Sequence, residues 1–441
     1  MKRSWLATVG AVVLVLLRFV PSAHAQQPYR LTLKDAIQLG LKANFSVLAS
    51  ATRLREAAGT RERRFSNLLP KARIESSLTR EKINLPALGI NIPFISPIVE
   101  VAPYDFRLYV DQPVLDLPTY RTWKSSEQHE RAAGNDYQDS RDVVIRSVAS
   151  LYLTSQAAAA LVDSAQSRVT LSQAFLKIAN DQHDAGVATG LDVLRAKVQL
   201  ANDQQALLVA QNAAKQALLV LARNIGLDLG TPLELAEPLK FGPVQPPEIA
   251  DAINTALVNR SDYLSLLRQR DEQAELLRAA QAKWLPRISL SGNYGANGTI
   301  AGISSVGTLQ GVLRWTIFDR DLQGERREIT SRLQRLDSQL ADLRLQIEED
   351  AREALLNLDS AHHEVQVAQD ALTLATQEVD LARVRFQAGA ANSIEVTTAQ
   401  DSFARAQQNQ VAALTRHIDA KIALARALGG VEKNYERILG H

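Results

Sequence analysis

The chain contains two copies of one sequence pattern, and this internal repeat restricts its fold more than any other feature. Asp35-Ala36-Ile37 returns as Asp251-Ala252-Ile253, an offset of 216 residues (251 − 35). Farther along, Ala185-Gly186 returns as Ala388-Gly389, an offset of 203 residues (388 − 185). The 13-residue difference (216 − 203) indicates an insertion in the first copy, between Pro70 and Asp116. A chain that repeats over most of its length is built from two equivalent structural units.

The N-terminus has the three parts of a secretory signal peptide. Lys2 and Arg3 precede an apolar run from Trp5 to Val20, and Ala23-His24-Ala25 follows as a cleavage site. We expect residues 1–25 to be a signal peptide and the mature protein to be exported. An uncleaved membrane anchor is the alternative, which the short run and Arg18 within it disfavour.

Charge and cysteine content exclude several classes of protein. Removal of residues 1–25 takes away Lys2, Arg3 and Arg18 and no acid, so the formal net charge falls from +2 to −1 (2 − 3). The mature chain therefore has no basic excess that would favour nucleic acid. The sequence has no cysteine, which excludes disulfides, thiolate metal sites and lipid attachment at the cleavage point.

Long helices dominate both repeats. In the second copy, apolar residues from Leu333 to Phe386 recur every three or four positions, and no proline or glycine interrupts residues 325–388. This pattern predicts a coiled-coil helix roughly 95 Å long at 1.5 Å per residue. We expect long helices at about 120–185 and 321–388. Each meets a glycine-containing hairpin and is followed by a returning helix, at about 191–226 and 393–429.

Four segments alternate with a period of two instead. Ile74 and Leu78 alternate with Arg73 and Glu75, and the other three segments repeat this pattern. We expect strands at about 72–82, 104–113, 287–298 and 308–318. Such alternation over about ten residues is typical of membrane β-barrel strands, but a soluble sheet resting on helices fits each single strand equally well.

Several features favour the membrane interpretation of the four strands together. Aromatic residues stand near the strand ends, as they do at a membrane interface: Tyr104, Trp284, Trp315 and Phe318. Four strands are too few to close a barrel, and open strand edges in lipid are costly, so such a protein must oligomerise. The proline-containing segment Asn84 to Pro103 is expected to be an irregular external loop that holds the 13 extra residues.

The sequence pattern predicts the following organisation. The signal peptide occupies 1–25, the first repeat 26–229, a proline-rich linker 230–247, the second repeat 248–430 and a C-terminal tail 431–441. The expected fold class is mainly α with a small β part, in which each protomer contributes long helical hairpins and four strands.

The duplication, the signal peptide and two matching hairpins resemble the TolC-like outer-membrane efflux proteins over about residues 29–430. The segment from Leu31 to Asn44 is similar to that family's opening helix, and Asp192-Val193 and Glu395-Val396 follow the two hairpins in matching positions. The resemblance implies a homotrimer whose strands form one barrel in the outer membrane and whose helices form a periplasmic tunnel. It also implies two partners, a periplasmic adaptor protein and an inner-membrane pump.

The resemblance also carries over site residues. Glu395 corresponds to an acid that lines the family's periplasmic constriction, where three copies would form an electronegative ring. The alternative is that Glu395 only stabilises a helix N-terminus. The family's second acid is replaced by Thr398 here, and its hairpin arginine by Ala391. The residues expected to form the tip and adaptor contact are Ala185, Gly186, Val187, Ala188, Thr189, Asp192, Arg385, Phe386, Gly389, Ala390 and Ala391.

No motif for catalysis or cofactor binding was found. His362 and His363 are adjacent and point to different helix faces, the other histidines are scattered, and the phosphate-binding and nucleophile motifs are missing. We therefore expect no enzyme activity, metal or cofactor. The sequence predicts a passive outer-membrane exit duct of a tripartite efflux or type I secretion system. The alternative is a soluble periplasmic coiled-coil adaptor or scaffold.

Overall fold

The computed structural model describes residues 29–238, 241–242, 244–299 and 302–432. The predicted signal peptide and most of the predicted C-terminal tail lie outside these residues. The chain divides into two compact units. The first unit contains residues 1–44, 144–243 and 360–420, and the second contains 45–143, 244–359 and 421–441. Each unit therefore takes segments from both sequence repeats.

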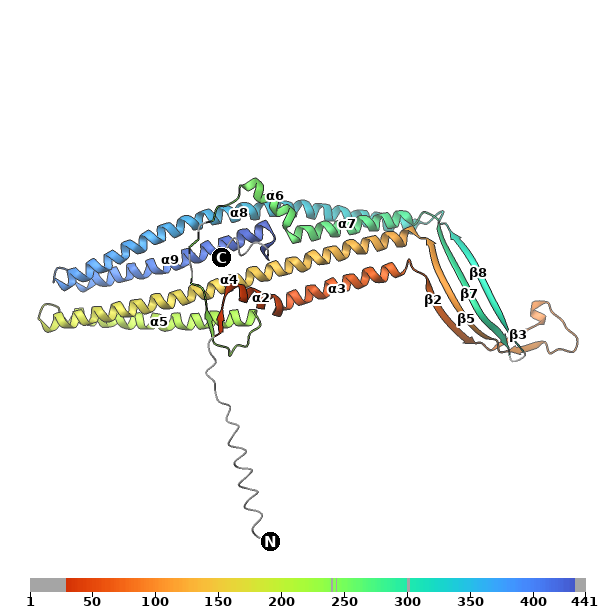
Figure 1. The fold of residues 1–441 in the computed structure, drawn as a ribbon, viewed down its shortest axis with the longest axis horizontal. Coiled ribbons are helices and arrows are strands. Elements are labelled where there is room, and N and C mark those ends of the chain that lie inside the picture. The colour runs from red at the N-terminus through yellow and green to blue at the C-terminus, as the bar shows by residue number, and fades with distance from the viewer. Residues whose placement is uncertain (1–28, 239–240, 243, 300–301, 433–441) are drawn as a thin grey trace, which may run out of the picture. The chain divides into compact units, whose positions relative to one another are not determined.

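Helices account for most of the described residues (Figure 1). The two longest are α4 (Leu117–Asp184) and α8 (Arg320–Gln387), followed by the returning helices α5 (Gly190–Asn224) and α9 (Ser393–Leu428). The shorter helices are α2 (Leu33–Ala43), α3 (Phe45–Ser66), α6 (Ile249–Asn259) and α7 (Ser261–Ala282). No described helix is both long and apolar enough to cross a membrane.

The predicted seam of α8 is buried as its period requires. Ile347, Ala351, Ala354, Leu358, Ala361, Val365 and Ala368 are all buried. In the first unit, Val365 and Ala368 of α8 pack against Ala413 of α9. The spacing of three and four residues puts these side chains on one face of each helix, so the pair packs as a coiled coil.

Four strands form one antiparallel sheet in the second unit, in the order β2-β5-β7-β8. Their bounds are Lys71–Leu78, Tyr104–Leu115, Arg287–Thr299 and Gly302–Arg314. The alternation seen in the sequence becomes two distinct faces. Ile74, Leu108 and Tyr294 lie side by side on one face, and Arg73, Tyr109 and Asn293 on the other.

The two faces of the sheet carry different kinds of side chain. On the apolar face, Ile74, Leu78, Leu108, Leu290, Leu309 and Leu313 are exposed within the single chain. On the polar face, Arg73 pairs with Glu75 at 2.7 Å and also with Asp111. Arg107 pairs with Asp105 at 2.6 Å on the same face. A sheet with charges on one side and unburied leucines on the other needs a different environment for each side.

Aromatic side chains lie at both ends of this sheet. Trp315 follows β8, and its indole N–H donates to the carbonyl oxygen of Trp284 at 3.1 Å. Phe318 follows and is exposed, while Tyr104 begins β5 at the opposite end. Two aromatic groups separated by the length of the strands fit the spacing of a membrane's two interfaces.

Two segments are more ordered than the sequence indicates. The predicted irregular loop contains a second hairpin, in which β3 (Glu81–Asn84) pairs with β4 (Ile98–Val101), and a short 3-10 helix, Pro86–Leu88. Likewise, β6 (Leu233–Leu235) lies inside the predicted linker and pairs in parallel with β1 (Tyr29–Leu31). Both pairings are made by backbone hydrogen bonds, which side-chain periodicity does not reveal.

Histidines that are scattered in sequence meet in the first unit. The rings of His362 on α8 and His417 on α9 are 6.1 Å apart, and both contact Phe241. Over the described part of the chain, however, no group of three metal-ligating side chains comes together.

Candidate functional site

The predicted tip residues lie in two helical hairpins of the first unit. The α4–α5 hairpin turns at Gly186 and the α8–α9 hairpin turns at Gly389, both with positive φ (76° and 70°). In the first hairpin Gly186 N donates to His183 O and Val187 N to Gln182 O; in the second, Gly389 N donates to Phe386 O and Ala390 N to Arg385 O. This is the Schellman arrangement, which requires a left-handed residue where only glycine is free of strain.

Each returning helix is capped by a polar side chain. Thr189 caps α5 in a reciprocal capping box with Asp192. For α9, Asn392 Oδ1 accepts from the backbone N–H of Glu395 at 3.1 Å. Asn392 is therefore the N-terminal cap of α9.

Ser393 has a different role, since it is buried and links the two hairpins. Its hydroxyl donates to Asp192 Oδ1 at 2.6 Å. Gln182 adds a second link, because its side-chain amide donates to the Phe386 carbonyl at 2.6 Å. The hydrogen bonds from Ser393 and then Thr189 hold the pKa of Asp192 below its usual range. Asp192 is therefore an ionised structural residue of the tip.

Glu395 occupies the matching position in the second hairpin but is exposed. Its Oε1 lies 3.0 Å from Arg385 Nε, and both side chains are about half exposed (42% and 50%). Thr398 is also exposed, one helical turn after Glu395 on α9. The predicted acidic position thus presents an ion pair rather than an isolated carboxylate.

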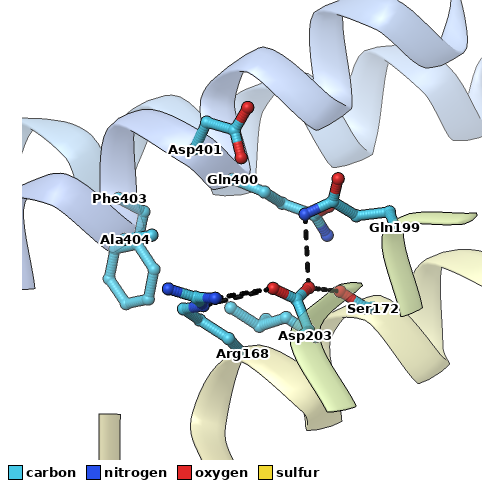
Figure 2. Close-up of a pocket in the computed structure, with 9 residues that line it drawn as sticks. Arg168, Ser172, Gln199, Asp203, Gln400, Asp401, Phe403 and Ala404 are labelled. Carbon is cyan, nitrogen blue, oxygen red and sulfur yellow. Dashed lines mark hydrogen bonds and ion pairs between the residues drawn. The ribbon is translucent and has the colours of Figure 1, made fainter. Parts of the chain in front are cut away.

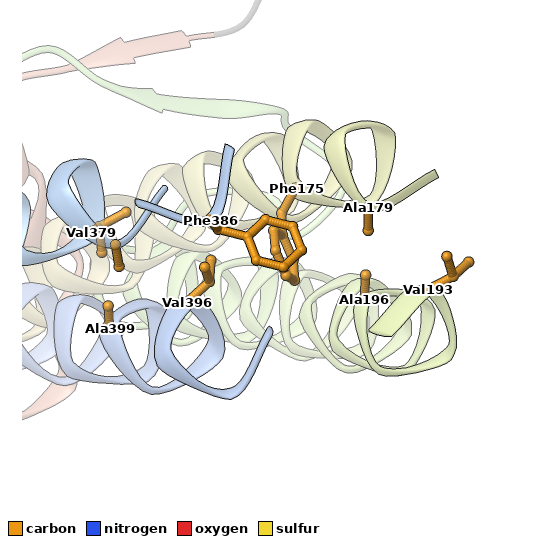
Figure 3. Close-up of a cluster of buried hydrophobic side chains, with 9 residues drawn as sticks. Phe175, Ala179, Val193, Ala196, Val379, Phe386, Val396 and Ala399 are labelled. Carbon is orange, nitrogen blue, oxygen red and sulfur yellow. The ribbon is translucent and has the colours of Figure 1, made fainter. Parts of the chain in front are cut away.

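A buried apolar cluster supports the hairpin ends (Figure 3). The Phe175 and Phe386 rings are 5.2 Å apart, and Ala391 packs against the same cluster. The remaining members are Ala179, Val193, Ala196, Val379, Ala382, Val396 and Ala399. Phe386 was predicted as an adaptor contact, but its burial makes it a core residue that holds the tip from within.

The outer surface of the tip comes from the remaining predicted residues. Ala185, Gly186, Val187, Thr189, Gly389 and Ala390 are exposed, while Ala188 is half-buried. Small residues and one exposed valine leave the backbone of both turns accessible. A partner can therefore approach closely without displacing large side chains.

A buried polar cluster that the sequence patterns did not predict lies farther along the α4–α5 hairpin (Figure 2). The buried Asp203 of α5 accepts from Arg168 Nη2 at 2.9 Å and from the Ser172 hydroxyl of α4. Gln199 donates to the same carboxylate at 3.3 Å. Together with Gln400, Asp401, Phe403 and Ala404 of α9, these residues line a water-sized cavity of about 10 Å³. Equivalent positions in the second repeat are Ala371, Ala375 and Ala406, so the polar cluster belongs to one repeat only.

The architecture defines a class of protein before any relative is considered. Long helical hairpins joined to a sheet with one apolar and one charged face are the parts of an outer-membrane export channel. The chain belongs to the Outer membrane efflux protein family, whose profile matches residues 36–227 and 252–430. This confirms the predicted family, and the two matched segments correspond to the two repeats.

Individual relatives agree with the family assignment. The pyoverdine export outer membrane protein OpmQ of Pseudomonas aeruginosa is 25% identical over 260 residues, and the match spans 58% of this chain and about half (54%) of that protein. The probable efflux pump outer membrane protein TtgC of Pseudomonas putida is 24% identical over 427 residues, which are 90% of this chain and 83% of that protein.

Solved structures support the fold. The CmeC outer membrane channel of Campylobacter jejuni superposes with a TM-score of 0.79 at 17% identity, covering 92% of this chain and 89% of that one. The predicted fold class, mainly α with a small β part, is confirmed. The chain is thus an outer-membrane efflux channel, and members of its family are channel proteins rather than enzymes. A soluble periplasmic adaptor or scaffold, the alternative raised by the sequence, is not supported.

Proposed function

We propose that three copies of this chain form a passive exit duct that receives substrate from a periplasmic adaptor and an inner-membrane pump. The observation that carries the proposal is the sheet of four strands with two free edges. Among the strands that the structure describes, β2 and β8 each pair with one neighbour only. Their outer backbone groups would be unsatisfied in lipid, at several kcal/mol each. Pairing β8 of one copy with β2 of the next removes both edges.

Three copies supply enough strands to close the sheets into a barrel. Three sheets give about twelve strands, above the roughly eight needed to close a barrel. In that barrel the exposed leucines would face lipid, and Arg73, Glu75 and Asp111 would line the water-filled interior. The four strands then belong to one shared barrel.

Exposed apolar stripes on the helices support the same assembly. On α5, Leu191, Leu194 and Val198 are exposed at spacings of three and four residues. On α8, Val367, Leu374 and Leu381 are exposed at spacings of seven. No described part of the chain covers either stripe, so the stripes of neighbouring copies can pack together as coiled-coil seams into a helical barrel.

The tip is the proposed contact with the adaptor, and Glu395 with Thr398 the proposed constriction. The turns at 185–189 and 389–391 are the accessible parts of this contact, while Asp192, Phe386 and Ser393 set their geometry. Because Arg385 pairs with Glu395, the ring of three carboxylates carries less negative charge than three free acids would. The relative named as an efflux pump protein favours efflux over type I secretion.

The proposal is tested by the conductance of the purified protein in a planar lipid bilayer. A folded oligomer should give discrete, ohmic single-channel steps without ATP or any other energy source. A β8 variant with Leu309→Pro, which disrupts edge pairing, should give none at the same protein concentration. Absence of conductance from a correctly folded wild-type oligomer would contradict a passive duct.

A further inference from the structure

The β3–β4 hairpin extends the sheet beyond the ends of β2 and β5. Thr79 N donates to Pro103 O at 3.1 Å, which joins the two hairpin arms to the sheet. β3 and β4 then pair from Glu81↔Val101 to Asn84↔Ile98, and Leu85 N donates to Pro97 O at 2.9 Å. The hairpin tip therefore has a defined base.

The composition of this tip is unusual for an exposed segment. The 17 residues from Ile83 to Val99 contain no Asp, Glu, Lys, Arg or His. Six apolar side chains of the tip are exposed: Leu88, Ile90, Ile92, Phe94, Ile95 and Ile98. Phe94 is completely exposed and has a positive φ of 81°, which is a strained backbone for a bulky residue. An apolar surface of this extent needs a partner that excludes water from it.

Charged residues separate the tip from the sheet. Arg80 pairs with Glu100 at 2.5 Å, and Glu81 and Lys82 lie beside them at the base of the hairpin. If the tip entered the acyl chains from this side, these charges would have to follow it toward the hydrocarbon at considerable cost. The arrangement instead places the charges near the outer membrane surface and the apolar tip beyond it.

A second copy of the same tip is the partner that fits these observations. When identical segments meet on a symmetry axis, every charge faces its own copy and repels it. A tip without charges avoids this repulsion and buries apolar area instead. Only one such hairpin exists per chain among the described residues, because β7 ends at Thr299 and β8 begins at Gly302. A trimer would therefore contribute three identical tips.

The hairpin is long enough to reach the axis of the proposed barrel. Twelve strands spaced about 4.8 Å apart and tilted by about 40° give a radius of roughly 12 Å. The paired arm from Glu81 to Leu85 alone spans about 13 Å at 3.3 Å per residue, and the rest of the tip extends beyond it. We propose that the three apolar hairpin tips pack against one another over the outer mouth of the channel and narrow it. This inference rests on the trimer proposed above.

Single cysteines test the contact in a chain that has none of its own. Phe94→Cys, and separately Leu88→Cys, would be oxidised in isolated outer membranes and run on a non-reducing gel. The matched control is Gly302→Cys, at the other outer connection, where an added Cβ meets open space. For both tip variants we expect up to two thirds of the monomer to run as disulfide-linked dimer. The control should show almost no dimer.

Other outcomes overturn the inference in distinguishable ways. A trimer by native mass in which neither tip variant crosslinks, or in which Gly302→Cys crosslinks equally, contradicts the tip contact and leaves the exit duct intact. A monomer by native mass contradicts both. If a fluorophore attached to the thiol of the Phe94→Cys variant is quenched by spin-labelled lipid while no crosslink forms, the tip lies in the membrane and the inference is wrong. Phe94→Asp should raise single-channel conductance, since three carboxylates would drive the tips apart; unchanged conductance contradicts the narrowing.

Discussion

The hydroxyl of Ser393 donates to the carboxylate of Asp192 at 2.6 Å and so joins the tips of the two repeats. Asp192 and Glu395 occupy equivalent positions, three residues after their helix caps Thr189 and Asn392. One acid is satisfied by internal hydrogen bonds and the other faces outward beside Arg385. The duplication has thus produced a structural acid in the first hairpin and an exposed acid in the second.

Ser393→Ala should loosen this link. The hydrogen bond to a carboxylate contributes about 1.5 kcal/mol, so amide hydrogens in the first turn of α9 should exchange roughly tenfold faster. Hydrogen exchange followed by mass spectrometry measures this directly. The control is Ser338→Ala on the exposed face of α8, because the Ser338 hydroxyl donates to Gln334 O within its own helix. Equal protection in wild type and Ser393→Ala would show that the bond does not hold the tip.

The same link should weaken in acid. Because the pKa of Asp192 is lowered in the folded protein, its stabilisation is complete above the unfolded value of about 3.9 and is lost as pH falls through the folded value. Protection of the tip in wild type should therefore approach that of Asp192→Asn below about pH 3.9 and exceed it at pH 6. A difference that does not change between these pH values would exclude Asp192 as the titrating group.

Glu395→Gln and Arg385→Gln should change ion selectivity in opposite directions. Removing the carboxylate reduces the cation preference of single channels, whereas removing the guanidinium frees the carboxylate and increases it. Reversal potentials in a salt gradient report both. Should the two variants shift selectivity in the same direction, or not at all, the constriction lies elsewhere.

Much of this fold follows from patterns in the sequence. The period of the apolar residues in α8 predicts its buried seam, and the alternation around Ile74 and Leu108 predicts the two faces of the sheet. Both are local consequences of where Cβ atoms point in helices and strands. Recognition of the repeat also located both glycine turns.

The remaining contacts depend on which chain segments meet in space. The β1–β6 pairing, the Ser393–Asp192 bond and the Arg385–Glu395 pair each join side chains or backbones whose orientation no periodicity specifies. Motif position places Phe386 among the tip residues but does not show that its side chain is buried. Asp203 was not predicted to be buried, because an aspartate on a helix is usually exposed. Its burial is explained only by the ion pair with Arg168, which the sequence does not show. Comparison with Ala406, its equivalent in the second repeat, is the signal that could have identified it.

Asp203→Ala should lower the free energy of unfolding more than removal of the whole Arg168–Ser172–Asp203 cluster does. The single change leaves Arg168 without its carboxylate in a site where the guanidinium side chain is only 18% exposed, at a cost of about 3–5 kcal/mol. The triple variant Arg168→Ala, Ser172→Ala, Asp203→Ala copies the second repeat and should recover much of that loss. Denaturant unfolding of detergent-solubilised protein compares them. Additive losses in the triple variant would contradict a coupled buried network.

Leu290→Arg and Ser291→Arg test the two faces of the sheet with adjacent residues. Leu290 lies on the apolar face and Ser291 opposite Asp111 on the polar face. Arginine facing lipid costs about 2–4 kcal/mol at the membrane midplane and less toward the interfaces, while arginine beside Asp111 is tolerated. The amount of folded protein in the outer membrane should fall for Leu290→Arg only. A loss confined to Ser291→Arg would invert the assignment of the faces.

The proposed exit duct requires three chains to share one outer-membrane barrel. Native mass of the mature chain after detergent extraction of purified outer membranes, by light scattering or native mass spectrometry, decides this. We expect a particle of three protein chains recovered from the outer-membrane fraction. A monomer or dimer recovered from the soluble periplasm would overturn the shared barrel, because the edges of β2 and β8 could then bond to water and would need no second copy.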